Sequence, residues 1–378
     1  MAIPAPITLD DLSKCSFDGH YTLLDPVGQG GYGTVYRAIE NPSQNTVAIK
    51  VVRTPEPGSF RAELLDLELE AIEKMHVLPS LVPLRHVFEE DDFTFIVLDY
   101  IDGGDLEDPI MQDRIFVGNN ERVRYVFNRM LIAVEDVHAY GYNHRDIKPA
   151  NFLATKGLER VFISDFGLCS KSSGSVEDSF GNYGRGTYTH LAPEGFASDP
   201  VKVDGAKSDV YALAITLFQM LYGEYPWLQS TSEDRCYKFF LGDRSEFFDW
   251  RDAYAADLGE PGLSLEARSL LIDALNPDMD KRLDLYEFDR RFSLIEEFFG
   301  SREPARRSLE PPNLESVSMF VVSSESDETE GSVPATPQQG LSLFMGALDE
   351  KFGELEEGGL RRRRPKVHSV DDDDDYVV

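Results

Sequence analysis

The 378-residue chain carries 37 basic and 68 acidic side chains, a formal net charge of -31, and 42% of its residues are apolar. This acidity argues against nucleic-acid and anionic-membrane partners, and no apolar run is long enough to span a bilayer. Because three scattered cysteines argue against a disulfide framework or a zinc site, and the N-terminus is unlike a secretory leader, we expect a cytoplasmic and/or nuclear protein.

After an N-terminal extension at residues 1–20, residues 21–101 have the pattern of a small β-rich lobe. Short runs rich in β-branched and aromatic residues are separated by turn residues, which is typical of strands. One stretch, residues 60–76, instead repeats its apolar residues on one face of a helix. These patterns predict a small antiparallel sheet with one main helix.

Residues 105–298 predict a larger lobe that is mostly helical. The stretch 121–138, for example, repeats apolar residues at the period of a helix, and only short strand-like segments lie between such stretches. A β-rich lobe followed by a helical lobe gives an α+β domain with two lobes over residues 21–298.

Composition changes near residue 300, where blocks of serine, glutamate, proline and charge replace the apolar periodicity. Such a segment cannot bury enough apolar area to offset the entropy lost on ordering, so residues 299–378 are predicted to be a mostly disordered tail. Apolar residues at helical spacing between residues 341 and 355 indicate either a solvated nascent helix or a docking element for a partner. The basic run 361–366 indicates either a nuclear import signal or a block balanced by the acidic run 371–375, and the second interpretation is favoured.

A glycine-rich motif, GQGGYG at residues 28–33, is the first feature that indicates chemistry. Glycines let backbone N–H groups approach phosphate oxygens where a Cβ would clash. In dinucleotide-binding folds a helix follows this spacing, whereas here the strand-like run TVYRAI follows at residues 34–39. Taken alone, the motif leaves a glycine-rich hairpin without a ligand equally open.

Four further motifs follow in order. Lys50 ends the strand-like run VAIK, from which its ammonium can reach phosphates held by the glycine-rich loop, although a lone strand lysine is usually solvated. The loop HRDIKPANFL at residues 144–153 places a carboxylate, an ammonium and a carboxamide close together. A carboxylate can orient a hydroxyl and accept its proton, and an amide oxygen suits magnesium. The strings SDFG at 164–167 and APE at 192–194 complete the set.

The five motifs, in this order, resemble the signature set of the eukaryotic protein kinases over roughly residues 20–298. The resemblance implies a small β-rich N-terminal lobe, a larger helical C-terminal lobe, and transfer of the γ-phosphate of ATP, with Mg²⁺, to protein hydroxyls. Lys148, two residues after Asp146, and Thr187, shortly before the APE string, have the spacing of the serine/threonine type.

The resemblance implies four catalytic residues. Asp146 is implied to be the catalytic base, and Lys148 is implied to contact the γ-phosphate of ATP. Lys50 is implied to hold the α- and β-phosphates. Its ion-pair partner on the predicted helix is implied to be Glu68, with Glu70 as the alternative.

The resemblance also implies where ATP and Mg²⁺ bind. Asn151 and Asp165 are implied to be the magnesium ligands. In the hinge between the lobes, Asp99 and Ile101 would bond adenine through their backbone, and Asp105 would bond the ribose. The full set of implied nucleotide-binding residues is Gly28, Gln29, Gly30, Gly31, Tyr32, Gly33, Val35, Ala48, Lys50, Asp99, Ile101, Asp105 and Leu153.

Other residues are implied to have supporting roles. Asp209 would anchor the catalytic loop, and Arg282 would pair with Glu194 of the APE string. Arg145 would bind a phosphate on the activation segment, residues 165–194, if this segment is phosphorylated, and a segment that is ordered without phosphate is equally open.

Two departures and one alternative complete the interpretation. His190 stands where the family usually has tyrosine, and Ala214 where it usually has glycine, which bears on peptide preference more than on catalysis. Basic protein substrates are expected if the acidic charge lies near the peptide groove. The alternative function is a pseudokinase that serves as a scaffold or an allosteric partner, although the lysine, the base and both metal ligands, whose loss is typical of pseudokinases, are present.

Overall fold

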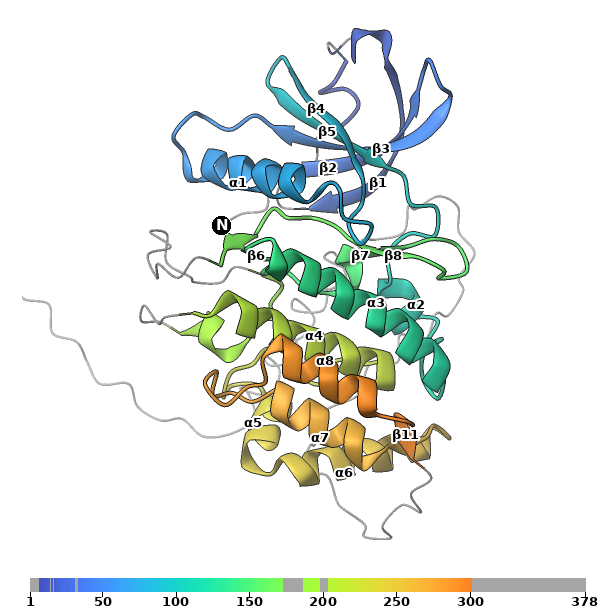
Figure 1. Ribbon diagram of the computed structural model, residues 1–378, viewed down its shortest axis with the longest axis vertical. Helices are drawn as coiled ribbons and strands as arrows, with labels where there is room; N and C mark the ends of the chain where they lie inside the picture. The colour runs from blue at the N-terminus through green and yellow to red at the C-terminus, as the bar shows by residue number, and fades with distance from the viewer. Residues whose placement is uncertain are drawn as a thin grey trace, which may run out of the picture. The chain divides into compact units, whose positions relative to one another are not determined.

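The structure is a computed structural model, and it describes residues 7–13, 15, 17–30, 33–172, 186–197 and 203–300. All of these belong to the first of two compact units, Met1–Ser316. The predicted disordered tail, apart from its first two residues, and residues 173–185 of the activation segment lie outside the described residues. Within the first unit, a sheet with one long helix precedes a larger set of helices, as the sequence predicts (Figure 1).

The N-terminal lobe is built on a five-stranded antiparallel sheet in the order β1-β2-β3-β5-β4. Successive side chains of a strand point to opposite faces. In β3, Val47, Ile49 and Val51 are fully buried on one face, which leaves Ala48 and Lys50 on the other. The strands are β1 (Tyr21–Gly30), β2 (Gly33–Glu40), β3 (Asn45–Arg53), β4 (Leu84–Glu90) and β5 (Phe93–Asp99).

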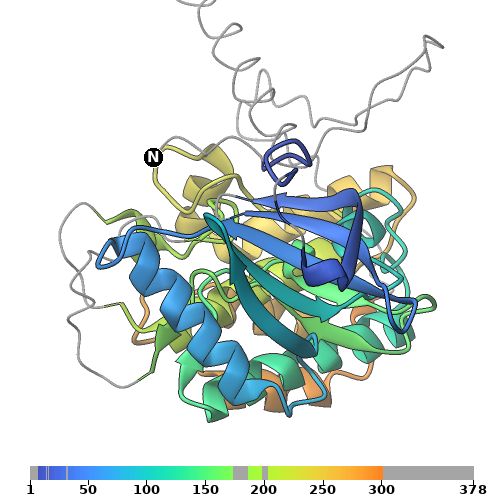
Figure 2. The ribbon, with the colours of Figure 1, turned by 90° about the horizontal axis from the view of Figure 1, so that it is seen from above.

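Helix α1 (Phe60–Met75) is the one long helix of this lobe and lies beside the sheet (Figure 2). Ser59 caps its first turn, because the Ser59 side chain accepts a hydrogen bond from the Ala62 N–H at 3.2 Å. Leu65 packs against Val52 of β3 and Ile96 of β5. The helix is therefore attached to the strand that carries Lys50.

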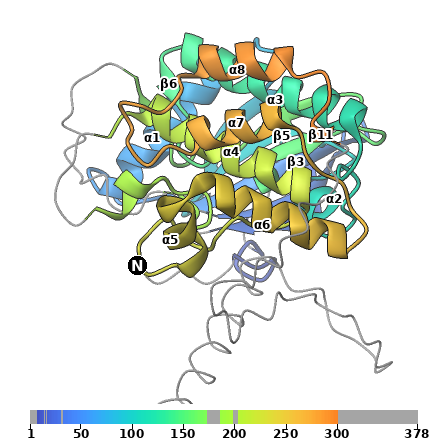
Figure 3. The same cartoon turned by 90° about the horizontal axis from the view of Figure 1, so that it is seen from below.

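The C-terminal lobe is organised around helix α4 (Gly205–Tyr222). Every side chain from Asp209 to Tyr222 is buried, as expected for a helix that is apolar on nearly all sides. Helices α2, α3, α7 and α8 contact it (Figure 3). The remaining helices are α2 (Glu107–Met111), α3 (Asn120–Ala139), α5 (Arg235–Gly242), α6 (Arg244–Asp257), α7 (Leu265–Ala274) and α8 (Leu285–Leu294).

Short strands form three antiparallel pairs in this lobe: β6 (Tyr142–Asn143) with β9 (Ser170–Lys171), β7 (Phe152–Ala154) with β8 (Val161–Ile163), and β10 (Gly262–Leu263) with β11 (Phe299–Gly300). Strand β11 takes in the first two residues that the sequence assigned to the tail, so the folded lobe extends past residue 298. Single-turn 3₁₀ helices are η1 (Phe17–Gly19), η2 (Pro149–Asn151) and η3 (Pro193–Phe196). In the described part of the chain, no helix has the length and apolar character needed to cross a membrane.

Candidate active site

The buried Lys50 is the centre of an ion-pair cluster in which both lobes take part. Its Nζ lies 2.6 Å from Glu68 Oε1 on α1 and 2.8 Å from Asp165 Oδ1 in the SDFG string. Glu68, and not the alternative Glu70, is therefore the partner of Lys50. One ammonium joins a strand, a helix and a loop of the C-terminal lobe.

The charges of Lys50 and Asp165 stabilise each other, whereas burial raises the pKa of Glu68 despite the Lys50 ammonium beside it. Burial lowers the pKa of Lys50, but the carboxylates of Asp165 and Glu68 more than offset this, so its pKa lies above the ordinary value. Burial raises the pKa of Asp165, but the Lys50 ammonium outweighs it and holds that pKa below the ordinary value. The Asp165 side chain is 43% exposed, against 10% for Lys50 and 4% for Glu68, so Asp165 is the member that a ligand can reach.

Asp146 is held through both carboxylate oxygens. Its Oδ2 accepts hydrogen bonds from Lys148 Nζ at 2.7 Å and from Asn151 Nδ2 at 3.1 Å. Its Oδ1 accepts from the N–H and the hydroxyl of Thr187, both at 2.9 Å, and Lys148 Nζ also donates to the Thr187 hydroxyl at 2.8 Å. The structure thus brings Thr187 against Asp146 and Lys148.

This arrangement keeps Asp146 ionised. Burial raises the pKa of Asp146, but the Lys148 ammonium outweighs it, and the pKa lies below its ordinary value. Burial lowers the pKa of Lys148, but the Asp146 carboxylate outweighs it, and that pKa is raised. A carboxylate fixed in this way can orient a hydroxyl and accept its proton.

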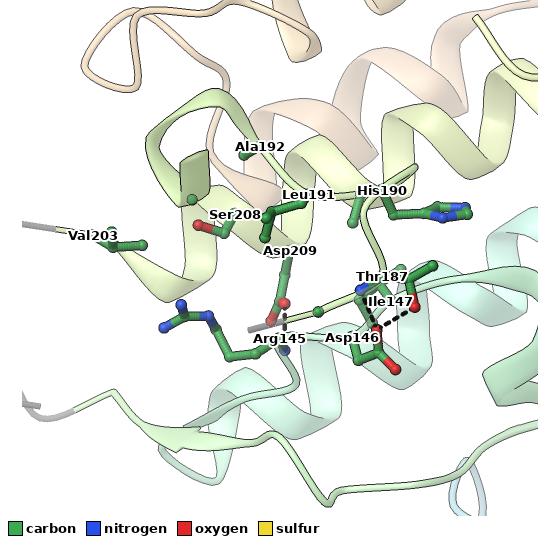
Figure 4. Close-up of a pocket in the computed structure, with 13 residues that line it drawn as sticks. Arg145, Asp146, Ile147, Thr187, His190, Leu191, Ala192, Val203, Ser208 and Asp209 are labelled. Carbon is green, nitrogen blue, oxygen red and sulfur yellow. Dashed lines mark hydrogen bonds between the residues drawn. The ribbon is translucent and has the colours of Figure 1, made fainter. Parts of the chain in front are cut away.

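Asp209 of helix α4 holds the turn that precedes Asp146. Its carboxylate accepts from the backbone N–H groups of His144 and Arg145, each at 2.8 Å, and contacts His138 Nε2 at 2.8 Å. Arg145 has φ 68°, a conformation that is uncommon for a residue other than glycine. Because the surrounding structure must hold such a turn in place, the two bonds from Asp209 position Asp146 (Figure 4).

Asn151 and Asp165 supply the oxygen atoms that suit a magnesium ion. Asn151 Nδ2 donates to the Asp146 carbonyl at 2.7 Å as well as to its carboxylate, so the amide orientation is fixed and Oδ1 is left as an acceptor. Asp165 Oδ1 is bonded to Lys50, whereas its Oδ2 takes no hydrogen bond from the described residues. Carboxylate and amide oxygens are hard ligands, and magnesium usually adds waters and substrate phosphates to one or two of them. The donor set therefore fits magnesium.

Two of the residues implied to contact the nucleotide, Val35 and Ala48, share the sheet face that carries Lys50. Val35 lies opposite Lys50 in the β2–β3 register, and Ala48 is the next residue of β3 on that face. Leu153 of β7 forms an isolated antiparallel β-bridge with Asp105 of the hinge between the lobes. Val35, Ala48 and Leu153 are half-buried, while their neighbours in sequence are largely buried.

The glycine-rich turn is described in part, and the hinge is described in full. A Cβ on Gly33 would lie 2.3 Å from the Val51 carbonyl oxygen, so only glycine allows the turn to enter β2 this close to β3. In the hinge, the Asp99 N–H donates to Pro83 at 3.0 Å, and the Ile101 N–H donates to no described residue. Gly28, Gln29 and Gly30 end β1, and Gly31 and Tyr32 lie outside the described residues.

A small pocket opens beside Asp146, between the catalytic loop, the end of the activation segment and α4 (Figure 4). Thr187 and His190 line it together with Asp146. Gly186 enters it at φ 119°, and a Cβ there would lie 3.0 Å from the Arg145 carbonyl oxygen, so glycine is required at this position. The backbone near residue 187 therefore lies against Asp146, to which the Thr187 N–H donates.

Arg282 and Glu194 form the predicted pair in the interior of the C-terminal lobe. Arg282 Nη1 and Nη2 donate to the two carboxylate oxygens of Glu194 at 2.7 and 2.8 Å, and its Nε donates to the Asn276 carbonyl at 3.0 Å. The Arg282 side chain is completely buried. A bidentate pair of this kind fixes the APE string on the lobe.

Two contacts were not found from the sequence. His190 is buried and hydrogen-bonds Gln219 Oε1 of α4 at 2.8 Å, and burial lowers its pKa to about 4. Sequence reasoning marked His190 only as a departure, and no local spacing connects it with Gln219. Glu70 pairs with Lys171 of β9 at 2.8 Å, which joins α1 to the start of the activation segment.

Comparisons with known proteins agree with this geometry. Residues 21–290 match the protein kinase domain family. The serine/threonine-protein kinase cds1 of Schizosaccharomyces pombe is 31% identical over 231 residues, which cover 58% of this chain and 48% of that protein. CBL-interacting protein kinase 10 of Oryza sativa is 28% identical, with 71% of this chain and 55% of the relative covered.

A longer match is to serine/threonine-protein kinase ULK3 of Xenopus laevis, which is 28% identical over 333 residues, 87% of this chain and 64% of that protein. The chain thus spans about half the length of several curated relatives that it matches.

Proposed function

The chain belongs to the protein kinase family, and on that premise we propose that it transfers the γ-phosphate of ATP to serine or threonine hydroxyls of proteins. The observation that carries the proposal is the joint assembly of two charged clusters. Lys50, Glu68 and Asp165 form the first, and Asp146 and Lys148 with Thr187 form the second. The names of the relatives, which are serine/threonine kinases, support the choice of hydroxyl.

The residues of the chain divide the work between donor and acceptor. The Lys50 ammonium, fixed by Glu68, binds phosphate oxygens of ATP on the face that also carries Val35 and Ala48. Lys148 offers a second ammonium beside Asp146 and neutralises charge at the γ-phosphate. Catalysis of this kind consists mainly of positioning and charge neutralisation.

Asp146 acts on the acceptor. It orients the substrate hydroxyl toward the γ-phosphorus, the hydroxyl oxygen forms the new bond to phosphorus, and the bond to the β–γ bridging oxygen breaks. The hydroxyl proton passes to Asp146, and ADP carries away the electron pair of the broken bond. Asn151 Oδ1 and Asp165 Oδ2 would hold Mg²⁺, which supplies positive charge to the phosphate oxygens.

Basic protein substrates and a docking role for the tail belong to the same proposal. The net charge of -31 supports a preference for basic substrates, because opposite charge speeds encounter. The apolar residues at helical spacing in the tail support a docking element for a partner protein. The scattered cysteines support a cytoplasmic and/or nuclear location. These residues of the tail lie outside the described residues.

Asp146→Asn tests the proposed reaction. Purified chain is incubated with labelled ATP, magnesium and a mixture of serine, threonine and tyrosine peptides, and phosphoamino acids are identified. We expect phosphoserine or phosphothreonine with the wild type, and a loss of about 10³-fold in kcat with Asp146→Asn, since the base is gone and the side-chain shape is kept.

Asp92→Asn is the matched control, because Asp92 is an exposed carboxylate in the turn between β4 and β5. It should leave the rate unchanged. Equal transfer by wild type and Asp146→Asn would contradict the proposal, and an absence of transfer with ATP binding intact would point to a scaffold that kept the fold.

A further inference from the structure

Residues 7–13, which precede the part of the chain that matches the kinase family, are built into the core of the N-terminal lobe. Ile7 and Leu12 are 5% and 3% exposed. They belong to one apolar cluster with residues of four strands, namely Tyr21, Tyr36, Ala38, Val47, Ile49, Val51, Phe93, Phe95 and Val97. The segment therefore covers the outer face of the sheet, opposite the face that carries Lys50.

Two buried hydrogen bonds attach the Ile7 backbone to β2. The Ile7 N–H donates to the Thr34 hydroxyl oxygen at 3.1 Å. The Tyr36 hydroxyl donates to the Ile7 carbonyl at 2.6 Å. Thr34 directly follows Gly33, so the segment reaches the point where the glycine-rich turn enters the strand.

Thr34 and Tyr36 flank Val35, and the alternation of a strand puts their side chains on the face opposite to Val35. Thr34 and Tyr36 are 3% and 2% exposed beneath the segment, whereas Val35 lies in register with Lys50 on the nucleotide face. Contacts on the outer face therefore fix the position of Val35 on the inner face.

We propose that residues 7–13 are a positioning element of the nucleotide site. The Ile7 backbone holds Thr34 and Tyr36, and through them it keeps Gly33 and Val35 at a fixed place beside Lys50. The segment touches neither ATP nor the reacting atoms, and its effect is on nucleotide affinity. This inference rests on the proposed function because it takes ATP as the ligand.

Thr34→Val tests the contact with little change of side-chain shape. It removes the acceptor of the Ile7 N–H and keeps the β-branched volume. We expect the Kd and KM for ATP with magnesium to rise about fivefold, with kcat within about twofold, since one buried hydrogen bond is lost and the reacting groups are untouched. Tyr36→Phe, which removes the second bond, should act in the same direction.

Thr94→Val is the matched control. Thr94 is fully buried in β5 of the same sheet, and its hydroxyl lies 3.0 Å from that of Thr54, far in sequence from the glycine-rich turn. It should lower the Tm about as much as Thr34→Val and leave the Kd for ATP unchanged. Wild-type Kd and KM in Thr34→Val would overturn the inference.

Hydrogen exchange separates this inference from the proposed function. Amides of β1 and β2 should exchange faster in full-length Thr34→Val than in the wild type, and Thr94→Val should not change them. If the wild type binds no ATP, the proposed function fails. The exchange result alone then decides whether residues 7–13 hold Gly33 and Val35 in place. Equal exchange of β1 and β2 in the wild type and Thr34→Val would overturn it.

Discussion

The junction between the two lobes and the interior of the C-terminal lobe each contain a carboxylate that accepts hydrogen bonds from the protein, but these two carboxylates differ in how many of their oxygens are used. Asp209 is 1% exposed at its side chain and accepts from two backbone N–H groups while it contacts His138. Asp165 is 43% exposed, and among the described residues only its Oδ1 is bonded, to Lys50. The first carboxylate is saturated by the protein, whereas the second keeps an oxygen for a ligand.

The difference separates Asp209, which holds the fold, from Asp165, which can bind a ligand. A buried group whose partners are all within the protein contributes to stability, and its loss leaves those partners unpaired. A group with a free oxygen beside a cluster of charges is arranged for chemistry. Replacing each carboxylate by its amide tests the distinction, because this change is chemically identical in both places.

Asp165→Asn should have the largest effect on activity and a small effect on stability. The amide keeps the shape but loses the charge and one of the two oxygen ligands offered to magnesium. We expect kcat/KM to fall by about 10³-fold, equivalent to about 4 kcal/mol. Lys50 retains Glu68 at 2.6 Å, so the free energy of unfolding should change by about 1 kcal/mol or less. Steady-state kinetics and urea unfolding measure the two quantities, and activity within tenfold of wild type would contradict the assignment.

Asp209→Asn should show the reverse order of effects. An amide offers one oxygen and one NH₂ group, so one of the N–H groups of His144 and Arg145 would face another donor. An unpaired buried N–H costs about 1–3 kcal/mol, and we expect that loss in the free energy of unfolding. Asp92→Asn, at an exposed turn, is again the control. A variant as stable as the wild type would show that the Asp209 carboxylate does not need both oxygens to accept from the His144 and Arg145 N–H groups.

The sequence predicted the lobes and the active-site residues because both depend on local patterns. The strands around Lys50 are runs rich in β-branched and aromatic residues between turn residues, and α1 repeats its apolar residues on one face of a helix. The catalytic loop is short enough that Asp146, Lys148 and Asn151 lie close together once the backbone turns. The spacing of the motifs carried the resemblance to the protein kinases, and the roles of the site residues came from that resemblance.

Contacts between distant segments could not be predicted in this way. His190 meets Gln219 only because the end of the activation segment packs on α4. Ile7 meets Thr34 because the segment before the sheet folds back over its outer face. Neither pair has a spacing or a motif of its own, since each depends on how separate elements pack.

His190 lies between the lobe junction and the interior of the C-terminal lobe. Its replacement should have the smallest effect at neutral pH of the changes considered. It lines the pocket beside Asp146 and Thr187, yet both ring nitrogens have partners, Gln219 Oε1 at 2.8 Å and the Thr189 hydroxyl at 3.0 Å. Burial lowers its pKa to about 4, from an ordinary value near 6.5. The folded protein thus favours the neutral imidazole, and the unfolded chain binds the proton first.

The sign of the pH dependence follows from this difference. Above about pH 6.5 the His190 ring is neutral in both the folded and the unfolded state, so His190 takes nothing from the free energy of unfolding. As the pH falls toward 4, only the unfolded chain gains a proton, and stability is lost by up to about 3 kcal/mol. His190→Gln cannot titrate, so its free energy of unfolding should fall less than that of the wild type between pH 7 and 4.5, with similar activity at pH 7. Parallel curves would mean that the imidazole is not buried as neutral, and that His190 belongs with the groups open to a ligand.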